Sequence, residues 1–184
     1  MKEKKIKTNK IPRQFFVTKG FGVDPYEKHA GAYHMALYDA KIADFNIQTY
    51  SSVLSPDSKL VTLDEIDLGS FGSELKCIMS CEFGEFGEFI SAGIIYAWMY
   101  EDENLNEKHG GLVCEVHGKF SVESLEERLY LVLNNLFERT YKDQGLFLGE
   151  PNVIIESGSV PNDIRYGCAL VSLCFIDYIT QSNY

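Results

Sequence analysis

The sequence has no apolar run near the roughly 20 residues that a membrane-spanning helix needs. Its most hydrophobic segment, residues 89–100, is bounded by Glu88 and Glu101. The basic N-terminus does not continue into the apolar stretch of a secretory signal either, because Arg13 interrupts it. We therefore expect a protein that neither crosses a membrane nor is secreted.

The sequence has fewer basic residues than acidic ones. The 184 residues contain 17 lysines and arginines against 27 aspartates and glutamates, which gives a formal charge of -10 and a pI near 4.8. An acidic protein repels phosphate backbones and anionic membranes, so binding to nucleic acid or to a membrane surface is not expected. Lysines gather in the first ten residues, and we interpret residues 1–10 as a flexible basic tail.

Cysteine pairs with the spacing of a metal site are missing as well. Cys77 and Cys81 have no second pair, and the total of five cysteines is odd. The sequence also lacks a P-loop, a Rossmann glycine pattern, a nucleophile elbow and a His-Glu-x-x-His motif. These absences argue against a metal centre, and buried, reduced thiols suit a cytoplasmic protein.

What is present is a series of short strands with two helices, in residues 11–184, a length that suits one domain. The helices are expected at residues 29–43 and after Ser121. The expected strands span residues 14–17, 45–54, 75–83, 88–99, 111–118, 152–155 and 167–176. Gly84 and Gly87 favour a hairpin between the third and fourth strands, and the apolar last strand is expected to be central. This order predicts an α+β fold in layers.

Two of these elements have distinct faces. In residues 111–118, alternation places Val113, Glu115 and His117 on one face of a strand, and the residues between them on the other. In the helix after Ser121, apolar residues recur at three- and four-residue spacing and predict a stripe that packs on a sheet. The stripe consists of Leu125, Leu129, Val132, Leu133, Leu136 and Phe137.

The strongest functional pattern begins after the first expected helix. Residues 36–42 read ALYDAKI, residues 44–56 read DFNIQTYSSVLSP, and residues 111–115 read GLVCE. Their order resembles the pyruvoyl-dependent arginine decarboxylases, in which an Ala-Leu-x-x-Ala helix leads through an asparagine to a serine pair, an apolar pair and a proline-bearing turn. A later Gly-apolar-apolar-x-Glu strand completes the pattern. The resemblance covers the chain from Lys10 onward.

The resemblance implies a carbon–carbon lyase that cleaves its own backbone between Ser51 and Ser52. The Ser52 hydroxyl would attack the Ser51 carbonyl, and elimination and hydrolysis would leave a β chain of residues 1–51 and an α chain of residues 52–184 that begins with a pyruvoyl group. That group would form a Schiff base with an amino acid, without pyridoxal phosphate or a metal. The expected reaction is arginine to agmatine and CO2.

Roles for other residues follow from the same resemblance. Glu115 would protonate the substrate α-carbon, with a pKa raised by apolar surroundings including Val113. Asn46 would hold an oxyanion or a carbonyl. The family's fold is an αββα-type sandwich of mainly antiparallel sheets, assembled as a homotrimer with active sites between subunits. His34, Leu37 and Val113 would bind the substrate, with His34 and Leu37 of one subunit facing Ser52 and Glu115 of the next.

Without the resemblance these residues have simpler interpretations. Ser51 and Ser52 would be two hydroxyls at a polar strand end, and Glu115 a solvated strand residue. Asn46 would be a turn residue. His117 shares a strand face with Glu115 and is interpreted as a polar residue near a turn.

One position departs from the family pattern. Where members that act on arginine carry an aspartate for the guanidinium, this sequence has His34. A guanidinium cannot lose its charge, so its burial without a carboxylate is costly. Alternatives are therefore a substitute acid, a different amino-acid substrate, or His34 as a helix residue at a subunit contact. A further alternative is an unprocessed scaffold or regulatory subunit. The substitute acids are Asp24, Glu27, Asp39 and Asp44.

Overall fold

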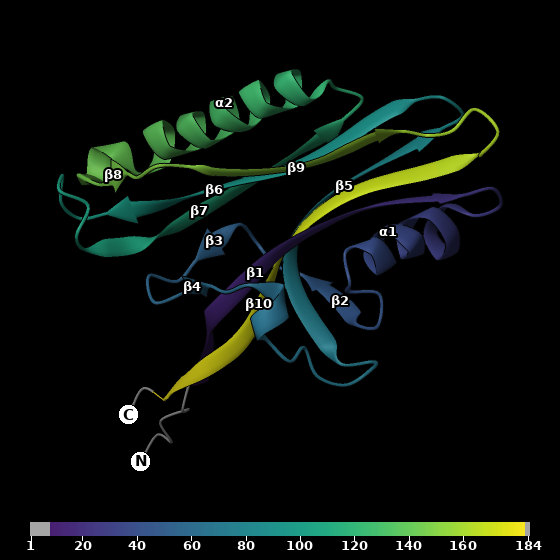
Figure 1. Ribbon diagram of the computed structural model, residues 1–184. Coiled ribbons are helices and arrows are strands. Elements are labelled where there is room, and N and C mark those ends of the chain that lie inside the picture. Colours follow the sequence, from purple (N-terminus) through teal and green to yellow (C-terminus); the bar gives the residue numbers. More distant parts are fainter. Residues whose placement is uncertain (1–7, 183–184) are drawn as a thin grey trace, which may run out of the picture.

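The computed structural model describes residues 8–182, arranged as two β-sheets with a helix on the outer side of each (Figure 1). The longer elements are β1 (Thr8–Asp24), α1 (His34–Asp39), β5 (Glu74–Glu85), β6 (Phe89–Tyr100), β7 (Lys108–Gly118), α2 (Val122–Thr140), β9 (Asn152–Ser159) and β10 (Tyr166–Ser182). The shorter ones are the π-helix η1 (Lys28–Tyr33), β2 (Asn46–Thr49), β3 (Val53–Leu54), β4 (Lys59–Leu60), β8 (Phe147–Leu148) and the 3-10 turns η2 (Leu63–Glu65) and η3 (Lys142–Gln144).

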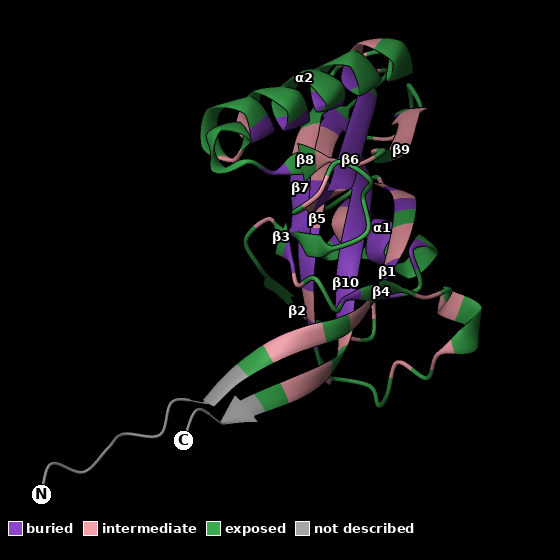
Figure 2. Ribbon diagram, turned by 90° about the vertical axis from the view of Figure 1, so that its left-hand side faces the viewer, coloured by how far each residue is buried: buried purple, intermediate pink, exposed green. Residues whose placement is uncertain are grey.

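The first sheet has the strand order β2-β5-β10-β1-β4. Its three long strands are antiparallel to one another, whereas β2 runs parallel to β5 and β4 runs parallel to β1. The apolar last strand, β10, lies between β5 and β1, which confirms its predicted central place. β1 and β10 remain paired beyond the body of the sheet as a projecting two-stranded ribbon (Figure 2).

The second sheet has the order β3-β7-β6-β8, and β9 also pairs with β6. All of these pairings are antiparallel. β6 is therefore the strand around which this sheet is built. Its burial explains why its sequence is almost continuously apolar rather than alternating.

Three apolar clusters separate the four layers. One lies between α1 and the first sheet, one between the two sheets, and one between the second sheet and α2. The predicted α+β, αββα-type sandwich is confirmed. At the inner interface the Oγ atom of Ser80 on β5 donates to the Val116 carbonyl 2.9 Å away and accepts from the Gly93 amide at 3.3 Å. These bonds tie the first sheet to β7 and β6 of the second.

The first helical segment differs from the single helix predicted for residues 29–43. It begins as the π-helix η1, where the Glu27 carboxylate accepts from the first two backbone amides, and continues as α1 to Asp39. It ends in a Schellman motif, because the amides of Lys41 and Ile42 donate to the carbonyls of Tyr38 and Leu37. The left-handed conformation of Lys41, with φ at 60°, stops the helix before the predicted end.

α1 also approaches the first sheet closely enough to require glycine. A Cβ atom at Gly20 would lie 2.2 Å from the Ala36 carbonyl oxygen, and one at Gly22 would lie 2.2 Å from the Ala36 nitrogen. These atoms belong to the helix backbone and cannot rotate away. The two glycines of β1 therefore set the spacing between α1 and the sheet.

The predicted hairpin of residues 75–83 and 88–99 is wrong. Gly87 does form a turn, with φ at 76°, but β5 pairs in the first sheet and β6 in the second. The glycines correctly predicted that the chain reverses direction here. The hydrogen-bond partners of β5 and β6, however, are strands that lie farther away in the sequence. The expected strand of residues 45–54 is likewise two strands, β2 and β3, which belong to different sheets.

α2 agrees with its prediction. The Ser121 hydroxyl accepts from the Ser124 amide and caps the helix, and its apolar stripe packs on the second sheet. Val132 is the exception, with 41% of its surface exposed. In the part of the chain that the structure describes, no helix has the length and hydropathy to cross a membrane.

Only part of the predicted basic tail belongs to the residues that the structure describes. Its residues 1–7 lie outside the described part of the chain, and β1 already begins at Thr8, opposite Ser182 of β10. The strand thus starts before Lys10, where the tail was expected to end.

Candidate active site

The chain crosses from the first sheet to the second through residues 50–52. On one side the Tyr50 amide donates to the Cys77 carbonyl of β5 at 2.8 Å, as an extension of the β2 pairing. On the other side Val53 pairs with Leu112 of β7. Ser51 is exposed and Ser52 half-buried between these two anchors. The crossing is therefore a short, accessible segment whose two ends are held by different sheets.

Ser52 and Glu115 meet at this crossing. The Ser52 hydroxyl donates to both carboxylate oxygens of Glu115, at 3.1 and 3.0 Å. The Ser52 carbonyl also accepts from the Val113 amide at 3.1 Å. Val113 is fully buried between the sheets, so it contributes to this site through its backbone. The structure thus brings three of the residues predicted for the site together within one chain.

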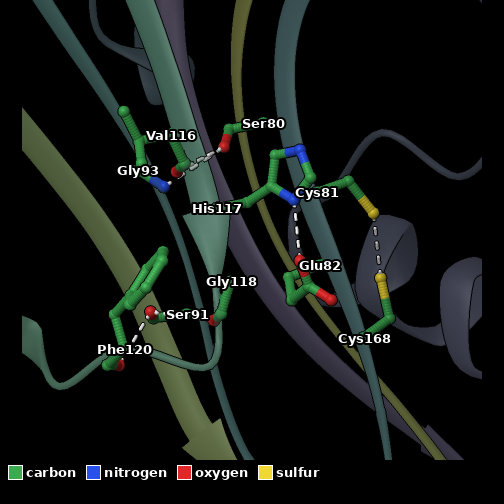
Figure 3. Close-up of polar contacts among 10 residues, drawn as sticks. All are labelled: Ser80, Cys81, Glu82, Ser91, Gly93, Val116, His117, Gly118, Phe120 and Cys168. Carbon is green, nitrogen blue, oxygen red and sulfur yellow. Dashed lines mark hydrogen bonds and ion pairs between the residues drawn. The ribbon is translucent and has the colours of Figure 1, made fainter. Parts of the chain in front are cut away.

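The predicted alternation of β7 accounts for the position of Glu115. Val113 packs between the sheets, whereas Leu112 and Cys114 pack beneath α2. Farther along the inner face, His117 Nδ1 lies 2.7 Å from Glu82 Oε2 on β5 (Figure 3). The inner face of β7 therefore directs Glu115 toward Ser52 of the crossing and His117 toward Glu82 of the first sheet.

Burial raises the pKa of Glu115 above that of an ordinary glutamate. The hydrogen bond from Ser52, together with the backbone of Glu115 itself, acts in the opposite direction and is the smaller effect. A carboxyl with a raised pKa and a hydroxyl at hydrogen-bond distance is an arrangement suited to proton transfer.

The carbonyl that precedes Ser52 is also engaged. The Ser51 oxygen accepts from the Val53 amide at 3.0 Å, which makes residues 51–53 a three-residue γ-turn centred on Ser52. Ser52 is not among the residues with positive φ, so the turn is of the inverse type. One backbone N–H group is consequently aimed at the oxygen on which negative charge would develop if the Ser51 carbonyl were attacked.

The structure places Asn46 elsewhere. Its amide Nδ2 donates to the Gly72 carbonyl at 2.6 Å, and its backbone N–H to the Ser73 carbonyl at 2.8 Å. Asn46 therefore binds the start of β2 to the loop that precedes β5. Within one chain its side-chain hydrogen bond goes to that loop rather than to the serine pair.

His34 and Leu37 are not brought to Ser52 within the chain. His34 is exposed at the start of α1, and Leu37 is buried in the cluster between α1 and the first sheet. Ser52 and Glu115 lie at the second sheet, beyond the opposite face of the first. A site that combined all four residues would require a second copy of the chain.

Three of the acids considered as substitutes at the His34 position bind backbone amides. Asp24 accepts from Tyr26 and Glu27, both at 2.7 Å, and Glu27 accepts from Lys28 and His29 at the start of η1. Asp39 accepts from Phe21 at 3.0 Å. Asp39 and Asp44 also line an open cavity of about 490 Å³. These hydrogen bonds give the three carboxylates structural roles.

Sequence reasoning missed an aromatic cluster beside the crossing. The Tyr50 ring lies 5.6 Å from that of Phe175, and Lys76 Nζ lies 5.8 Å from the Tyr50 ring centre and 5.5 Å from that of Tyr178. Desolvation raises the pKa of Tyr178. The available signal was the position of Tyr50 next to the serine pair, but the aromatic residues of the cluster, Phe175 and Tyr178, are more than a hundred residues away in the chain.

Other features lie apart from the crossing. A cavity of about 640 Å³ opens between β1 and β9, and neither Ser52 nor Glu115 lines it. Within residues 8–182, no three His, Cys, Asp or Glu side chains are arranged to hold a metal ion. At the crossing Ser52 supplies a hydroxyl, Glu115 a carboxyl, and Val53 and Val113 backbone amides.

Comparison with known proteins gives a consistent set of similarities. The sequence profile of the family described as pyruvoyl-dependent arginine decarboxylase (PvlArgDC) matches residues 14–180. A protein of Thermoplasma volcanium named pyruvoyl-dependent arginine decarboxylase is 32% identical over 129 residues, 65% of this chain and 68% of that protein.

Two relatives named pyruvoyl-dependent arginine decarboxylase 2 match a shorter segment at higher identity. Those of Methanosarcina acetivorans and Methanosarcina mazei are 46% and 44% identical over 55 residues, 30% of this chain. The matched segment spans only 29% of the length of each of these two relatives.

Proposed function

The chain belongs to the pyruvoyl-dependent arginine decarboxylase family, and from this premise we propose that it is a self-processing amino-acid decarboxylase with arginine as its first candidate substrate. The observation that carries the proposal is the contact between the Ser52 hydroxyl and both Glu115 carboxylate oxygens. The product from arginine is agmatine, with release of CO2. The proposed location is the cytoplasm.

Self-processing begins at Ser52. Glu115 takes the proton of the Ser52 hydroxyl, and the oxygen attacks the Ser51 carbonyl carbon. The amide nitrogen leaves with a proton, which converts the peptide bond into an ester. Loss of the Ser52 α-proton then expels the Ser51 carboxylate, and water hydrolyses the remaining group with release of ammonia. The 3.0 Å contact satisfies the distance requirement for a general base, roughly 2.6–3.2 Å.

Val53 supports the first step through its backbone. Its N–H group donates to the Ser51 oxygen at 3.0 Å in the intact chain, so the donor is already in place when charge develops on that oxygen. A preorganised donor of this kind stabilises a transition state without a reorganisation cost.

The residues present fit a pyruvoyl group at position 52, since the serine from which it derives is accessible and adjoins a proton-exchanging carboxyl. The group would hold the substrate amine and accept the electron pair left by departing CO2. Val113 would hold the segment through its backbone amide. Asn46 is proposed to act near a carbonyl of the site only after movement of the loop that it now binds.

Glu115 is proposed to change roles after processing. In the intact chain burial raises the pKa of Glu115, and the Ser52 hydrogen bond opposes part of that rise, which favours the carboxylate form that a base requires. Processing consumes that hydroxyl, so the opposing effect disappears and burial raises the pKa further. The protonated carboxyl then supplies the proton to the substrate α-carbon.

We also propose assembly into a homotrimer, with each site shared between subunits. Support comes from the separation described above: His34 and Leu37 belong to the outer side of the first sheet, whereas Ser52 and Glu115 meet at the second. The neighbouring subunit would present the start of α1 to the pair. Leu37 would act there as packing beneath His34, since it is 6% exposed.

A different amino-acid substrate is the second candidate function. His34 is exposed and offers no fixed negative charge, and three of the nearby acids already bind backbone amides. A guanidinium would then lack the carboxylate partner that bidentate recognition uses. A panel of amino acids under saturating conditions separates the two: efficient agmatine formation would rule out the altered specificity.

The test of self-processing compares two neighbouring serines. Denaturing mass spectrometry of the wild-type protein should give the first 51 residues separated from the remaining 133 of the 184, with a blocked N-terminus on the longer chain. Ser52→Ala should stay intact, because it lacks the attacking oxygen. Ser51→Ala should still be cleaved, because it keeps the attacked carbonyl. An intact wild-type chain would instead favour the scaffold or regulatory role.

A further inference from the structure

Two cysteines on neighbouring strands of the first sheet lie in contact. The Sγ atoms of Cys81 on β5 and Cys168 on β10 are 3.4 Å apart (Figure 3). In the strand register Cys81 faces Leu170 and Cys168 faces Phe83, so the two cysteines are diagonal neighbours. A disulfide bond is about 2.05 Å long, and the sulfur atoms are already close enough for a modest movement to join them.

The two thiols differ in their access to solvent. Cys168 is fully buried, whereas Cys81 is half-buried. The hydrogen bond with Cys81, followed by burial, raises the pKa of Cys168, and the nearby charge of Lys28 acts in the opposite direction. Cys81 is therefore the thiol of this pair that a reagent from solvent can reach.

The other three cysteines lack this combination. Cys77 and Cys174 face each other across the same two strands, but both are fully buried, and burial raises the pKa of Cys174 well above its usual value. Cys114 lies on the second sheet in the cluster beneath α2. Of the five thiols, Cys81 is the one that is not buried.

We propose that Cys81 and Cys168 form a reversible redox-modification site, which low-molecular-weight disulfides oxidise in the folded protein. The Cys81 thiolate attacks one sulfur of the reagent, and the reagent S–S bond breaks with release of one small thiol. Cys168 then loses its proton and attacks Cys81 Sγ, which expels the second small thiol. The protein loses two electrons and two protons, and the reagent gains them as two thiols.

The site lies under the helical segment that leads to His34. Tyr33, at the end of η1, donates its hydroxyl to the Met79 sulfur at 3.5 Å and lies 6.2 Å from the Phe83 ring. Met79 and Phe83 flank Cys81 on the same face of β5. Diagonal residues on neighbouring strands have their Cα atoms farther apart than directly opposed residues. Formation of the disulfide must therefore shift β5 against β10 and disturb the packing of Tyr33.

The experiment treats the purified full-length protein with 2-hydroxyethyl disulfide and maps its peptides without reduction. The expected result is a linked peptide pair containing residues 81 and 168, a mass lower by two hydrogen atoms, and recovery with dithiothreitol. Cys168→Ser should stop at a mixed disulfide on Cys81, and Cys114→Ser should behave as the wild type. The absence of the 81–168 link in the wild type, or a 77–174 link in its place, would overturn the proposal.

Hydrogen exchange tests the coupling to the helix. Amides of residues 28–40 should exchange faster in the oxidised protein than in the reduced one, and equal exchange would refute that coupling. Neither the peptide mapping nor the hydrogen exchange depends on decarboxylase activity, and both can be repeated on the Ser52→Ala variant. The outcome therefore does not depend on the proposed function.

Discussion

Replacing Glu115 by glutamine tests the proton transfer on which the proposed processing rests. Glutamine keeps the shape of the side chain and an oxygen that can accept from Ser52, but it cannot take up the hydroxyl proton. The Ser52 hydroxyl lies 3.0 and 3.1 Å from the carboxylate oxygens, within reach of a general base. A base in this position accounts for about 10²–10⁴ in rate, or about 3–5 kcal/mol of activation free energy.

The assay follows cleavage of chains made by cell-free synthesis, sampled from the end of translation and separated by denaturing mass spectrometry. The Glu115→Gln variant should cleave about 10²–10⁴ times more slowly than the wild type. Glu82→Gln, a matched change of the carboxylate that binds His117, should cleave at the wild-type rate. A folded Glu115→Gln variant that cleaves as fast as the wild type would refute the role of Glu115.

The pH dependence supplies an independent check. Because burial raises the pKa of Glu115 above its usual value near 4.5, the wild-type cleavage rate should increase as the pH rises through that raised pKa. The unfolded chain ionises at the lower, usual pKa. The stability of the uncleavable Ser52→Ala variant relative to Ser52→Ala/Glu115→Gln is therefore greatest below the usual pKa and is lost as the pH rises through the raised one. Urea titrations at pH 4 and pH 7 measure that difference.

Three further predictions concern specificity and packing, two of them with a control substitution. His34→Asp should raise kcat/KM for arginine by about 10- to 150-fold, if a hydrogen bond to a charged group contributes about 1.5–3 kcal/mol; His34→Gln should not, and steady-state agmatine assays compare them. Gly22→Ala should lower the free energy of unfolding by at least about 1–3 kcal/mol, because the added Cβ meets the Ala36 backbone; thermal unfolding would show no change if the spacing of α1 were adjustable. Leu129→Ala, fully buried, should cost about 2–5 kcal/mol. Leu131→Ala, 60% exposed on the same helix, should stay within about 0.5 kcal/mol in urea titrations.

The parts of the fold that could be predicted depend on neighbouring residues. Ser121 and the three- and four-residue spacing that follows it are sufficient to specify α2, and alternation specifies the two faces of β7. The family pattern in turn indicated that Ser52 and Glu115 belong to one site. Their separation of 63 residues in the chain is bridged by the short pairing of β3 with β7, which periodicity alone does not indicate.

The errors concern partners that are distant in the chain. The turn at Gly87 reverses the direction of the chain, but β5 and β6 do not pair with each other. β5 pairs with β10 in the first sheet, and β6 pairs with β7 in the second. The strand expected at residues 45–54 is interrupted because its two halves find partners in different sheets. The aromatic cluster around Tyr50 was missed for the same reason, since Phe175 belongs to the last strand.

The strand order of the first sheet determines what a backbone break after residue 51 would do to folding. Residues before the break supply β1 and β2, which flank the β5–β10 pair on both sides. The two pieces would remain joined by main-chain hydrogen bonds along both flanks, so cleavage need not release either piece. Refolding, however, would become a bimolecular reaction that depends on concentration, whereas the intact chain folds in a unimolecular one. The precursor would therefore be the form that folds readily, and the cleaved protein would be an assembly that is difficult to rebuild after denaturation.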